Sequence, residues 1–485
     1  MNNPVKRRKI ILFLFTLKLL TIYYFFRSRS AEDDTETPIS SSLKRWPSLP
    51  SFRPWLPTPD VPVGSCEGYF GNGFTQQITV LEESSAGWFR CFYSATLQTS
   101  VCEGGGLRMD PEKISMSKGD EPLESVMGRK EDDELPVFHD GAFEIGVSDG
   151  SRAGRNLVNE EFLNKYLPRG SENRHIMRAL MASTRLVDAN KFQCSEWVEE
   201  PTLLVTRFEY ANLFHTLTDW YSAYVASRVV GLPRRPHVVF VDGHCQSALD
   251  EMWRALFSSV RFAKSFAGPV CFRHAILVPL GYQTAMFEGL DGRIDCSGVA
   301  PNETEQHPNT RKTARLSEFG EMLRAAVGLP PNEHRSSLTS GHTILFIRRE
   351  NYVAHPRATG KVESRLSNEK QIFTSVKSWA ANYSGCKLNV VNGLFAHMHM
   401  EDQIEIIQHS TIIVGAHGAG LSHIISALPN TSVLEILSPS YRRPHFRLMA
   451  RWKGLNYHPL YLNSSYAHPV TVIKALDDIV KGLGC

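Results

Sequence analysis

Residues 411–429 read TIIVGAHGAGLSHIISALP, and this stretch decides the fold of the second half of the chain. It begins with an apolar strand, predicted at Thr411–Val414, and continues with three glycines within six residues. An apolar helix is predicted from Leu421 up to Pro429. A strand, a glycine turn and a helix in this order aim free backbone N–H groups and the positive helix end at one point, so the turn predicts an anion site.

The residues of this turn offer specific contacts to such an anion. Gly418 and Gly420 would let the backbone approach a diphosphate closely, and His417 could contact the leaving phosphate or the sugar attached to it. The same pattern also fits a tight strand-to-helix turn that binds nothing, since glycine turns are common in α/β proteins. Spacing alone leaves both interpretations open.

Strand-like and helical segments alternate on either side of the turn. The apolar runs are TLLVTRFEY (202–210), HVVFVDG (237–243), HAILVPL (274–280), HTILFIRRE (342–350), CKLNVVNGL (386–394) and TSVLEIL (431–437). Helical stretches are expected up to residue 230, over 249–257, from 369, over 401–409 and over 470–480. We therefore predict an α/β fold with two Rossmann-like domains, residues 64–335 and 336–485, facing a ligand cleft at the carboxyl ends of their strands.

The N-terminus carries a membrane-insertion signal. Residues 10–26 (IILFLFTLKLLTIYYFF) are apolar except for two threonines and Lys18, and four basic residues at positions 6–9 precede them. No A-x-A-like cleavage site follows, so we interpret this segment as an uncleaved transmembrane helix with residues 1–9 in the cytosol. A cleaved signal peptide is the alternative. Residues 27–63 are rich in proline and serine and are predicted to form an extended stem.

Two further features agree with a luminal body. All nine cysteines follow residue 26, which allows up to four disulfides and leaves one thiol, for which the chain end suggests Cys485. Sequons for N-glycosylation occur at Asn302, Asn382, Asn430 and Asn463. The 53 basic and 50 acidic residues give a net charge of +3, which is too balanced to predict a nucleic-acid partner.

A second set of candidate residues follows the predicted strand at 342–347. Arg349 ends this strand beside Arg348, and Arg365, Asn368 and Glu369 follow near a helix start. Arginines at strand ends suit bidentate phosphate contacts, although Arg348 fits a solvent-facing basic residue almost as well.

Glu435 lies inside the apolar run TSVLEIL, where an unpaired charge would be costly. It should therefore have a partner. The two candidates are a ribose hydroxyl of a bound nucleotide and a structural arginine.

The third set of candidates lies in ANLFHTLTDWYSAYV (211–225). On a helix, Asn212, His215 and Asp219 form one polar stripe. A carboxylate four residues after a histidine can fix its tautomer and make it a better general base. Spacing alone favours a plainer interpretation, a capped helix start with a surface ion pair.

The sequence contains no D-x-D, the acidic motif with which many glycosyltransferases hold Mn²⁺. His397 and His399 could be imagined as metal ligands, but no cysteine or carboxylate framework of metal spacing accompanies them. We therefore predict no metal site.

Several longer strings resemble glycosyltransferase family 61. They are GSCEGYFGNGF, WFRCFYS, EEPTLLVTRFEYANLFHT, RPHVVFVDGHC, VGAHGAGLSHI and the terminal GLGC, and they cover most of the predicted luminal body. The resemblance implies an inverting, metal-independent transferase of GT-B-like fold, resident in the Golgi membrane. The family motif maps onto Asn212, His215 and Asp219, onto Arg349, Arg365, Asn368 and Glu369, and onto His417, Gly418 and Gly420.

The resemblance also suggests the reaction. The strings are most similar to members that move xylose from UDP-xylose to O2 of the core β-mannose of N-glycans, while other members use arabinose or N-acetylglucosamine. We expect His215, oriented by Asp219, to be the general base, with His417 or Asp219 itself as rivals. The alternatives are a xylan xylosyl- or arabinosyltransferase and an anchored glycan-binding protein without turnover.

Overall fold

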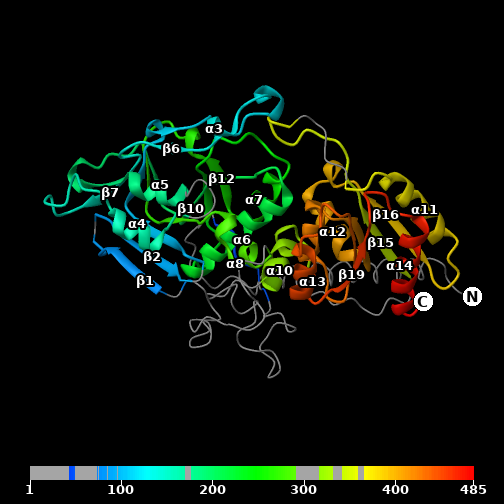
Figure 1. Cartoon of the computed structure of the whole chain (residues 1–485). Helices are drawn as coiled ribbons and strands as arrows, with labels where there is room; N and C mark the ends of the chain where they lie inside the picture. The colour runs from blue at the N-terminus through cyan, green and yellow to red at the C-terminus, as the bar shows by residue number, and fades with distance from the viewer. Residues whose placement is uncertain are drawn as a thin grey trace, which may run out of the picture. The chain divides into compact units, whose positions relative to one another are not determined.

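The computed structural model describes residues 43–47, 49, 74, 76–84, 86–95, 97–169, 176–290, 316–330, 341–358 and 365–485 (Figure 1). The predicted cytosolic tail, the predicted transmembrane helix and most of the predicted stem lie outside these residues, as does the predicted domain boundary at 335 and 336. Within the described ranges, no helix combines the length and the apolar character needed to span a membrane.

A short piece of the predicted stem packs on the folded body. Trp46 Nε1 donates a hydrogen bond to the Leu232 carbonyl (3.0 Å), and its ring meets the Tyr224 ring edge-on. The backbone N–H of Lys44 donates to Ser258 Oγ (2.8 Å). Residues 43–47 are therefore held against the body, which differs from the extended stem predicted for them.

The N-terminal sheet has seven strands in the order β1-β2-β3-β14-β10-β11-β12. Its strands are β1 (Gln76–Leu81), β2 (Trp88–Ser94), β3 (Thr99–Gly105), β10 (Thr202–Val205), β11 (His237–Phe240), β12 (Ser259–Phe262) and β14 (Ala275–Leu277). The last four run parallel, and β3 joins them antiparallel through β14. All four residues of β10 are buried, as expected for a central parallel strand covered on both faces.

Helices α6 (Leu213–Val229), α7 (Asp250–Leu256), α8 (Ala285–Leu290) and α10 (Leu316–Ala326) belong to the same part of the chain. Helix α6 is buried along most of its length and shares one apolar cluster with residues of the C-terminal part of the chain, including Ile413 and Phe446. Trp220 and Tyr224 of this helix are each 1% exposed. This burial fixes the N-terminus of α6, where three of the candidate residues lie.

A second sheet of five strands, in the order β8-β7-β4-β13-β9, and the pair β5-β6 lie beside the N-terminal sheet. Their bounds are β4 (Leu107–Met109), β5 (Ile114–Ser115), β6 (Val137–Phe138), β7 (Phe143–Val147), β8 (Thr184–Asp188), β9 (Glu196–Val198) and β13 (Val270–Phe272). The helices of this region are η2 (Pro111–Lys113), η3 (Leu123–Val126), α3 (Glu131–Glu134), α4 (Glu160–Tyr166), α5 (Ile176–Ser183), η4 (Ala189–Lys191), η5 (Ala263–Ser265) and η6 (Gly281–Gln283).

The C-terminal sheet has five parallel strands in the order β16-β15-β17-β18-β19. They are β15 (His342–Ile347), β16 (Leu388–Gly393), β17 (Ile412–Ala416), β18 (Ser432–Leu437) and β19 (Asn456–Tyr461). Helices α11 (Glu369–Ala381) and α14 (Pro469–Gly482) pack on one face, and α12 (Met400–His409) and α13 (His445–Lys453) pack on the other, as Figure 1 shows. Two 3₁₀ helices complete this part, η7 (Phe395–His397) and η8 (Ala419–Ser426).

The predicted α/β alternation is confirmed, with one correction and several additions. The segment after the glycine turn is the 3₁₀ helix η8, not the expected longer helix from Leu421. Strands β12 and β19 and helix α13 were not predicted, because their sequences lack a long apolar run. The mixed α/β architecture fits a glycosyltransferase.

Three disulfides link described cysteines, Cys91–Cys102, Cys194–Cys271 and Cys386–Cys485. The suggestion that Cys485 is the unpaired thiol is therefore wrong, because the C-terminal helix α14 brings the chain end back to Cys386. Among the described cysteines the free one is Cys245, which is buried. Cys66 and Cys296 lie outside the described residues.

Candidate active site

The C-terminal sheet changes winding direction between β15 and β17. With β15 counted as the first strand, the sheet order is 2-1-3-4-5, so the connections leave β15 and β17 toward opposite sides. Ligands of open α/β sheets bind at the carboxyl ends of the strands at such a point. Arg349 follows the end of β15, and His417 and Gly418 follow the end of β17, so the two predicted donor motifs meet there.

A pocket opens at this place. It brings together five predicted residues and five that the sequence did not single out, namely Asn212, His215, Arg365, His417 and Gly418, with Phe214, Ala419, Tyr441, Arg443 and Phe446. Both the N-terminus of α6 and the glycine turn of the C-terminal sheet contribute to its wall. The pocket is therefore a concave site with a few polar groups converging on it, as small-ligand sites usually are.

The glycines of the turn have different neighbours. A Cβ atom on Gly418 would collide with the guanidinium of Arg349, so glycine at this position lets Arg349 lie against the turn. A Cβ atom on Gly420 would meet Ile347 Cγ2 at 2.9 Å, inside the apolar core. Gly418 is thus a glycine of the site, whereas Gly420 is absent from the pocket wall and is required by packing.

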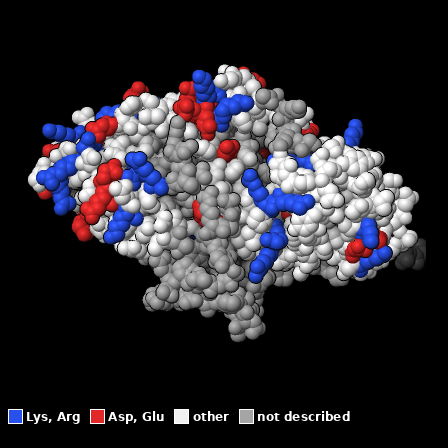
Figure 2. All heavy atoms as spheres, viewed as in Figure 1, with Lys and Arg blue, Asp and Glu red and all other residues white. Residues whose placement is uncertain are grey.

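Two arginines, Arg365 and Arg443, line the pocket, and a third, Arg349, lies against Gly418 of the turn. Burial and the neighbouring Arg365 lower the pKa of Arg349, and burial and Arg443 lower that of Arg365. Arg365 also lies over the Tyr441 ring, 3.3 Å from its centre. In the part of the chain that the structure describes, no carboxylate forms an ion pair with Arg349 or Arg443. Figure 2 shows basic side chains grouped over α12 and α13, and such an excess of positive charge favours an anionic ligand.

Arg348, Asn368 and Glu369 support this group from behind. Glu369 accepts a hydrogen bond from the Arg349 backbone N–H (3.0 Å) and lies 3.7 Å from Arg348 Nε. Asn368 Nδ2 donates to the Ala467 carbonyl (2.8 Å), which ties the start of α11 to the loop before α14. None of the three lines the pocket, so their geometry positions Arg349 and does not bring them into contact with a ligand there.

His417 is fixed by a fully buried carboxylate. Its Nδ1 lies 2.5 Å from Glu435 Oε1, and the Tyr457 hydroxyl donates to Glu435 Oε2 at 2.5 Å. Glu435 is 0% exposed. The partners of Glu435 are therefore a histidine and a tyrosine and not the expected arginine, and its full burial keeps it from the ribose hydroxyl that was the other candidate.

The sheet geometry explains this triad. Glu435 is level with Gly415 on the neighbouring strand β17, and Tyr457 on β19 is two residues before the partner of Glu435. Side chains two residues apart on a strand point to the same face. His417, Glu435 and Tyr457 therefore share one face of the sheet.

The N-terminus of α6 forms the opposite wall. Asn212 Oδ1 accepts a hydrogen bond from the Phe214 backbone N–H (3.0 Å), so the predicted helix cap is confirmed. Asn212, Phe214 and His215 line the pocket. Asp219 does not line it; its Oδ1 accepts from the Gly281 backbone N–H (2.9 Å) in the loop after β14.

The expected pairing of His215 with Asp219 is therefore wrong, and so is the surface ion pair that was its alternative. Nδ1 of His215 is buried without a hydrogen-bond partner. Burial, with Arg443 and His445 nearby, lowers the pKa of His215 to about 4. Burial raises the pKa of Asp219 to about 7, since Asp219 is 5% exposed. The i, i+4 spacing places His215 and Asp219 on the same helix, but the Asp219 carboxylate bonds to the backbone N–H of Gly281 and not to the histidine.

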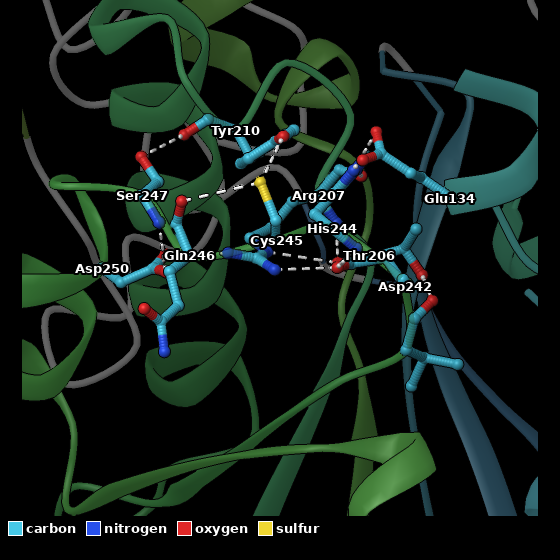
Figure 3. A network of polar contacts seen from close by, with 12 residues as sticks. Glu134, Thr206, Arg207, Tyr210, Asp242, His244, Cys245, Gln246, Ser247 and Asp250 are labelled. Carbon is cyan, nitrogen blue, oxygen red and sulfur yellow. Dashed lines mark hydrogen bonds and ion pairs between the residues drawn. The ribbon is translucent and has the colours of Figure 1, made fainter. Parts of the chain in front are cut away.

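A buried polar network lies at the carboxyl ends of β10 and β11 (Figure 3). Arg207 is fully buried and forms ion pairs with Asp242 and Asp250, each at 2.8 Å. His244 Nε2 donates to the Arg207 carbonyl (2.9 Å), and its Nδ1 lies 3.1 Å from Glu134 Oε2. These contacts fix the loop between β10 and α6, which positions Asn212 and His215.

The histidines considered as metal ligands lie apart from the pocket. His397 pairs with Glu350 (2.9 Å) and His399 with Glu251 (2.9 Å), and both histidines are largely exposed. In the described ranges, one cluster has ligands of metal type, His342 with Cys386 and Cys485, and its two sulfurs form a disulfide. Asn382, Asn430 and Asn463 are exposed, and Asn302 lies outside the described residues.

Tyr441 and Arg443 are the functional residues that sequence reasoning missed. They lie in the segment SYRRPH before α13, which has no strand or glycine pattern to mark it. A basic pair beside an aromatic residue at a helix start was the available signal. This signal alone does not indicate a site; Tyr441 and Arg443 become candidates because they line the same pocket as the glycine turn.

Comparison with known proteins identifies the family of the chain. The family described as Glycosyltransferase 61 matches residues 161–434. The chain belongs to this family. The glycosyltransferase is 54% identical to the β-1,2-xylosyltransferase of Arabidopsis thaliana over 532 aligned residues, which cover 100% of this chain and 99% of the relative. Identity to the β-1,2-xylosyltransferase of Oryza sativa subsp. japonica is also 54%, covering 94% of this chain and 86% of the relative.

Part of the chain is also similar to a more distant protein. The EGF domain-specific O-linked N-acetylglucosamine transferase of Gallus gallus is 22% identical over 278 residues, covering 55% of this chain and 45% of that protein. That protein is named for transfer of N-acetylglucosamine, whereas the two plant relatives are named for transfer of xylose.

Proposed function

We propose that this glycosyltransferase moves xylose from UDP-xylose to O2 of the core β-linked mannose of N-glycans, with inversion at the anomeric carbon. The observation that carries the proposal is the 54% identity over the whole chain to a protein named for β-1,2-xylosyl transfer. The N-acetylglucosamine transferases match over only 55% of the chain and at 22% identity. The pocket suits this chemistry because it combines a glycine turn, two arginines and two imidazoles.

In this proposal the departing UDP is stabilised by residues of the chain. Arg349 and Arg365 are the residues proposed for this role, since Arg365 lines the pocket and Arg349 lies against Gly418 of the turn, and Arg443 adds a third charge. Guanidinium groups aimed at the diphosphate lower the barrier for its departure in a site that excludes water. The two Rossmann-like parts are proposed to face each other as in GT-B transferases, with the acceptor entering beside Asn212 and His215.

We propose that the transfer needs no metal ion, because the sequence has no D-x-D and the arginines supply the positive charge. Activity should persist in EDTA at a concentration that removes Mn²⁺ and Mg²⁺. Strict dependence on added Mn²⁺ would contradict this part of the proposal.

We further propose that residues 10–26 anchor the protein in the Golgi membrane with the body in the lumen. The apolar run behind four basic residues supports an anchor of this orientation, and three disulfides and three exposed sequons suit an oxidising, glycosylating compartment. In sealed Golgi vesicles, added protease should leave the body intact until detergent is present, and a glycosidase should shift its mobility. Cleavage of the body in sealed vesicles would contradict the orientation.

The decisive experiment incubates the purified full-length chain with a panel of UDP-sugars and an N-glycan that ends in N-acetylglucosamine. A mass gain of one pentose from UDP-xylose, linked to O2 of the core mannose, is the expected result. Transfer of another sugar, or transfer to xylan instead of the N-glycan, would assign a different reaction within the family. Binding of the glycan without transfer from any donor would favour the glycan-binding alternative.

A further inference from the structure

The pocket contains two imidazoles, and only one of them has the environment of a base. A general base for sugar transfer must accept a hydroxyl proton and hold its ring in one orientation during the reaction. The two candidates lie on opposite walls, His417 after β17 and His215 in α6.

The contacts of His417 determine which of its nitrogens faces the pocket. Its backbone N–H donates to the Ile436 carbonyl (3.0 Å), which continues the ladder between β17 and β18 past the end of the strand. A carboxylate oxygen accepts hydrogen bonds, so the contact with Glu435 points Nδ1 of the ring at Glu435 as the donor. Nε2 is then the nitrogen left for the pocket that His417 lines.

Glu435 is itself held in place. The Tyr457 hydroxyl donates a hydrogen bond to the second carboxylate oxygen, so rotation of the carboxylate would break one of its two hydrogen bonds. The three side chains come from three neighbouring parallel strands, whose register is fixed by the sheet. This arrangement matches the histidine–carboxylate pairs that stabilise an imidazolium as it forms.

His215 lacks these supports. No hydrogen bond holds its Nδ1, and the carboxylate of Asp219 is bound to the Gly281 N–H. Aromatic rings surround it, with Tyr282 at 5.1 Å and Phe214 at 5.3 Å between ring centres. An imidazole whose pKa is lowered to about 4 holds a proton too weakly to be an efficient base near neutral pH.

We propose that His417, held by Glu435 and Tyr457, is the general base of the transfer, and that His215 contacts substrate without taking its proton. The inference rests on the proposed function in that the protein must transfer a sugar with inversion. The acceptor oxygen forms its bond to the anomeric carbon while the bond from that carbon to the diphosphate oxygen breaks, and the electron pair leaves with UDP. The hydroxyl proton passes to Nε2 of His417, and Glu435 stabilises the resulting imidazolium before the proton is released to water.

The test compares His417→Gln, His215→Gln and Tyr457→Phe in the full-length chain. We measure kcat, the dissociation constant of UDP and the pH profile of kcat/KM, using whichever sugar the wild type transfers. His417→Gln should lower kcat by about 10²–10⁴-fold with UDP binding nearly unchanged, as expected for loss of a general base. His215→Gln should lower kcat by less than about tenfold, a change too small for a lost base.

Tyr457→Phe separates a positioning role from a merely structural one. Without the hydroxyl, the charge of Glu435 is concentrated toward His417 and favours its protonated ring, so the acidic limb of the profile should move to higher pH. An unmoved limb, a His417→Gln enzyme within tenfold of wild type, or a larger loss in His215→Gln would each overturn the proposal. If His417→Gln does not fold, as judged by lost UDP binding, the pH profile of Tyr457→Phe decides.

A failure of the base assignment can be told apart from a failure of the proposed function. If the wild type transfers a sugar other than xylose, the xylosyl assignment is wrong, and the three variants still test the base with that sugar. If the wild type transfers no sugar from any donor, both proposals are overturned.

Discussion

The pocket has a histidine on each wall, and the two differ in what holds them. His417 and Glu435 are 18 residues apart in sequence and meet at 2.5 Å, because adjacent parallel strands place them on one face. His215 and Asp219 are four residues apart on α6, yet Asp219 bonds to Gly281. Closeness in sequence did not pair this histidine with this carboxylate, because the Gly281 N–H bonds to Asp219 instead. Whether a histidine pairs with a carboxylate therefore depends on which other hydrogen-bond donors lie close to that carboxylate.

The largest expected effect comes from breaking the pair that forms. Glu435→Gln keeps the size of the side chain but removes the charge that stabilises a protonated His417. We expect kcat to fall by about 10²-fold or more, with little change in the dissociation constant of UDP. Steady-state kinetics and calorimetric UDP titration would measure both. A Glu435→Gln enzyme with normal kcat would mean that the triad only supports the fold.

A smaller effect is expected when a side chain is added to the glycine turn, where the UDP part of the donor is proposed to bind. Gly418→Ala places a methyl group against the Arg349 guanidinium, while the extended backbone at φ 168° accepts alanine. Displacing Arg349 should weaken UDP binding by about tenfold, or ~1.4 kcal/mol. Gly420→Ala is the matched control, since its methyl group meets Ile347 in the core and should lower the melting temperature without changing UDP affinity. Equal losses of affinity in both variants would count against a specific role for Gly418.

The pair that does not form should tolerate substitution. Asp219→Asn keeps an oxygen that can accept from the Gly281 N–H, so kcat should stay within about threefold of wild type. The pKa of Asp219 rises from 3.8 to about 7 on folding, so its contribution to stability is present below pH 3.8 and is lost as the pH rises from there through 7. Melting temperatures between pH 4 and 7 should therefore fall less steeply with pH in the variant. A large loss of kcat in a folded Asp219→Asn enzyme would restore Asp219 as a catalytic candidate.

The smallest effect concerns His215 and the acid side of stability. Its pKa falls from 6.5 to about 4 on folding, so the unfolded chain binds a proton that the folded chain does not. The contribution of this neutral imidazole is present above pH 6.5 and is lost as the pH falls toward 4. His215→Gln should therefore lose less stability than wild type over this range in chemical unfolding experiments. Equal slopes would show that His215 titrates normally in the folded protein.

The sequence by itself determined the order of the main elements and most of the wall of the site. The run at 411–429 marked a strand and a glycine turn, Asn212 marked the start of α6, and Arg349 marked the end of β15. These features depend on neighbours within a few residues, through strand periodicity, capping and glycine conformations. Patterns that depend only on neighbouring residues can be predicted from a single sequence.

Only the tertiary structure decided the partners. The register of β17, β18 and β19 joined His417, Glu435 and Tyr457, and the loop after β14 supplied the N–H that took Asp219. The same folding brought Tyr441 and Arg443 over the turn and Cys485 to Cys386. Buried polar groups take whichever partner lies at the right distance and angle, and that choice depends on chain segments far apart in the sequence.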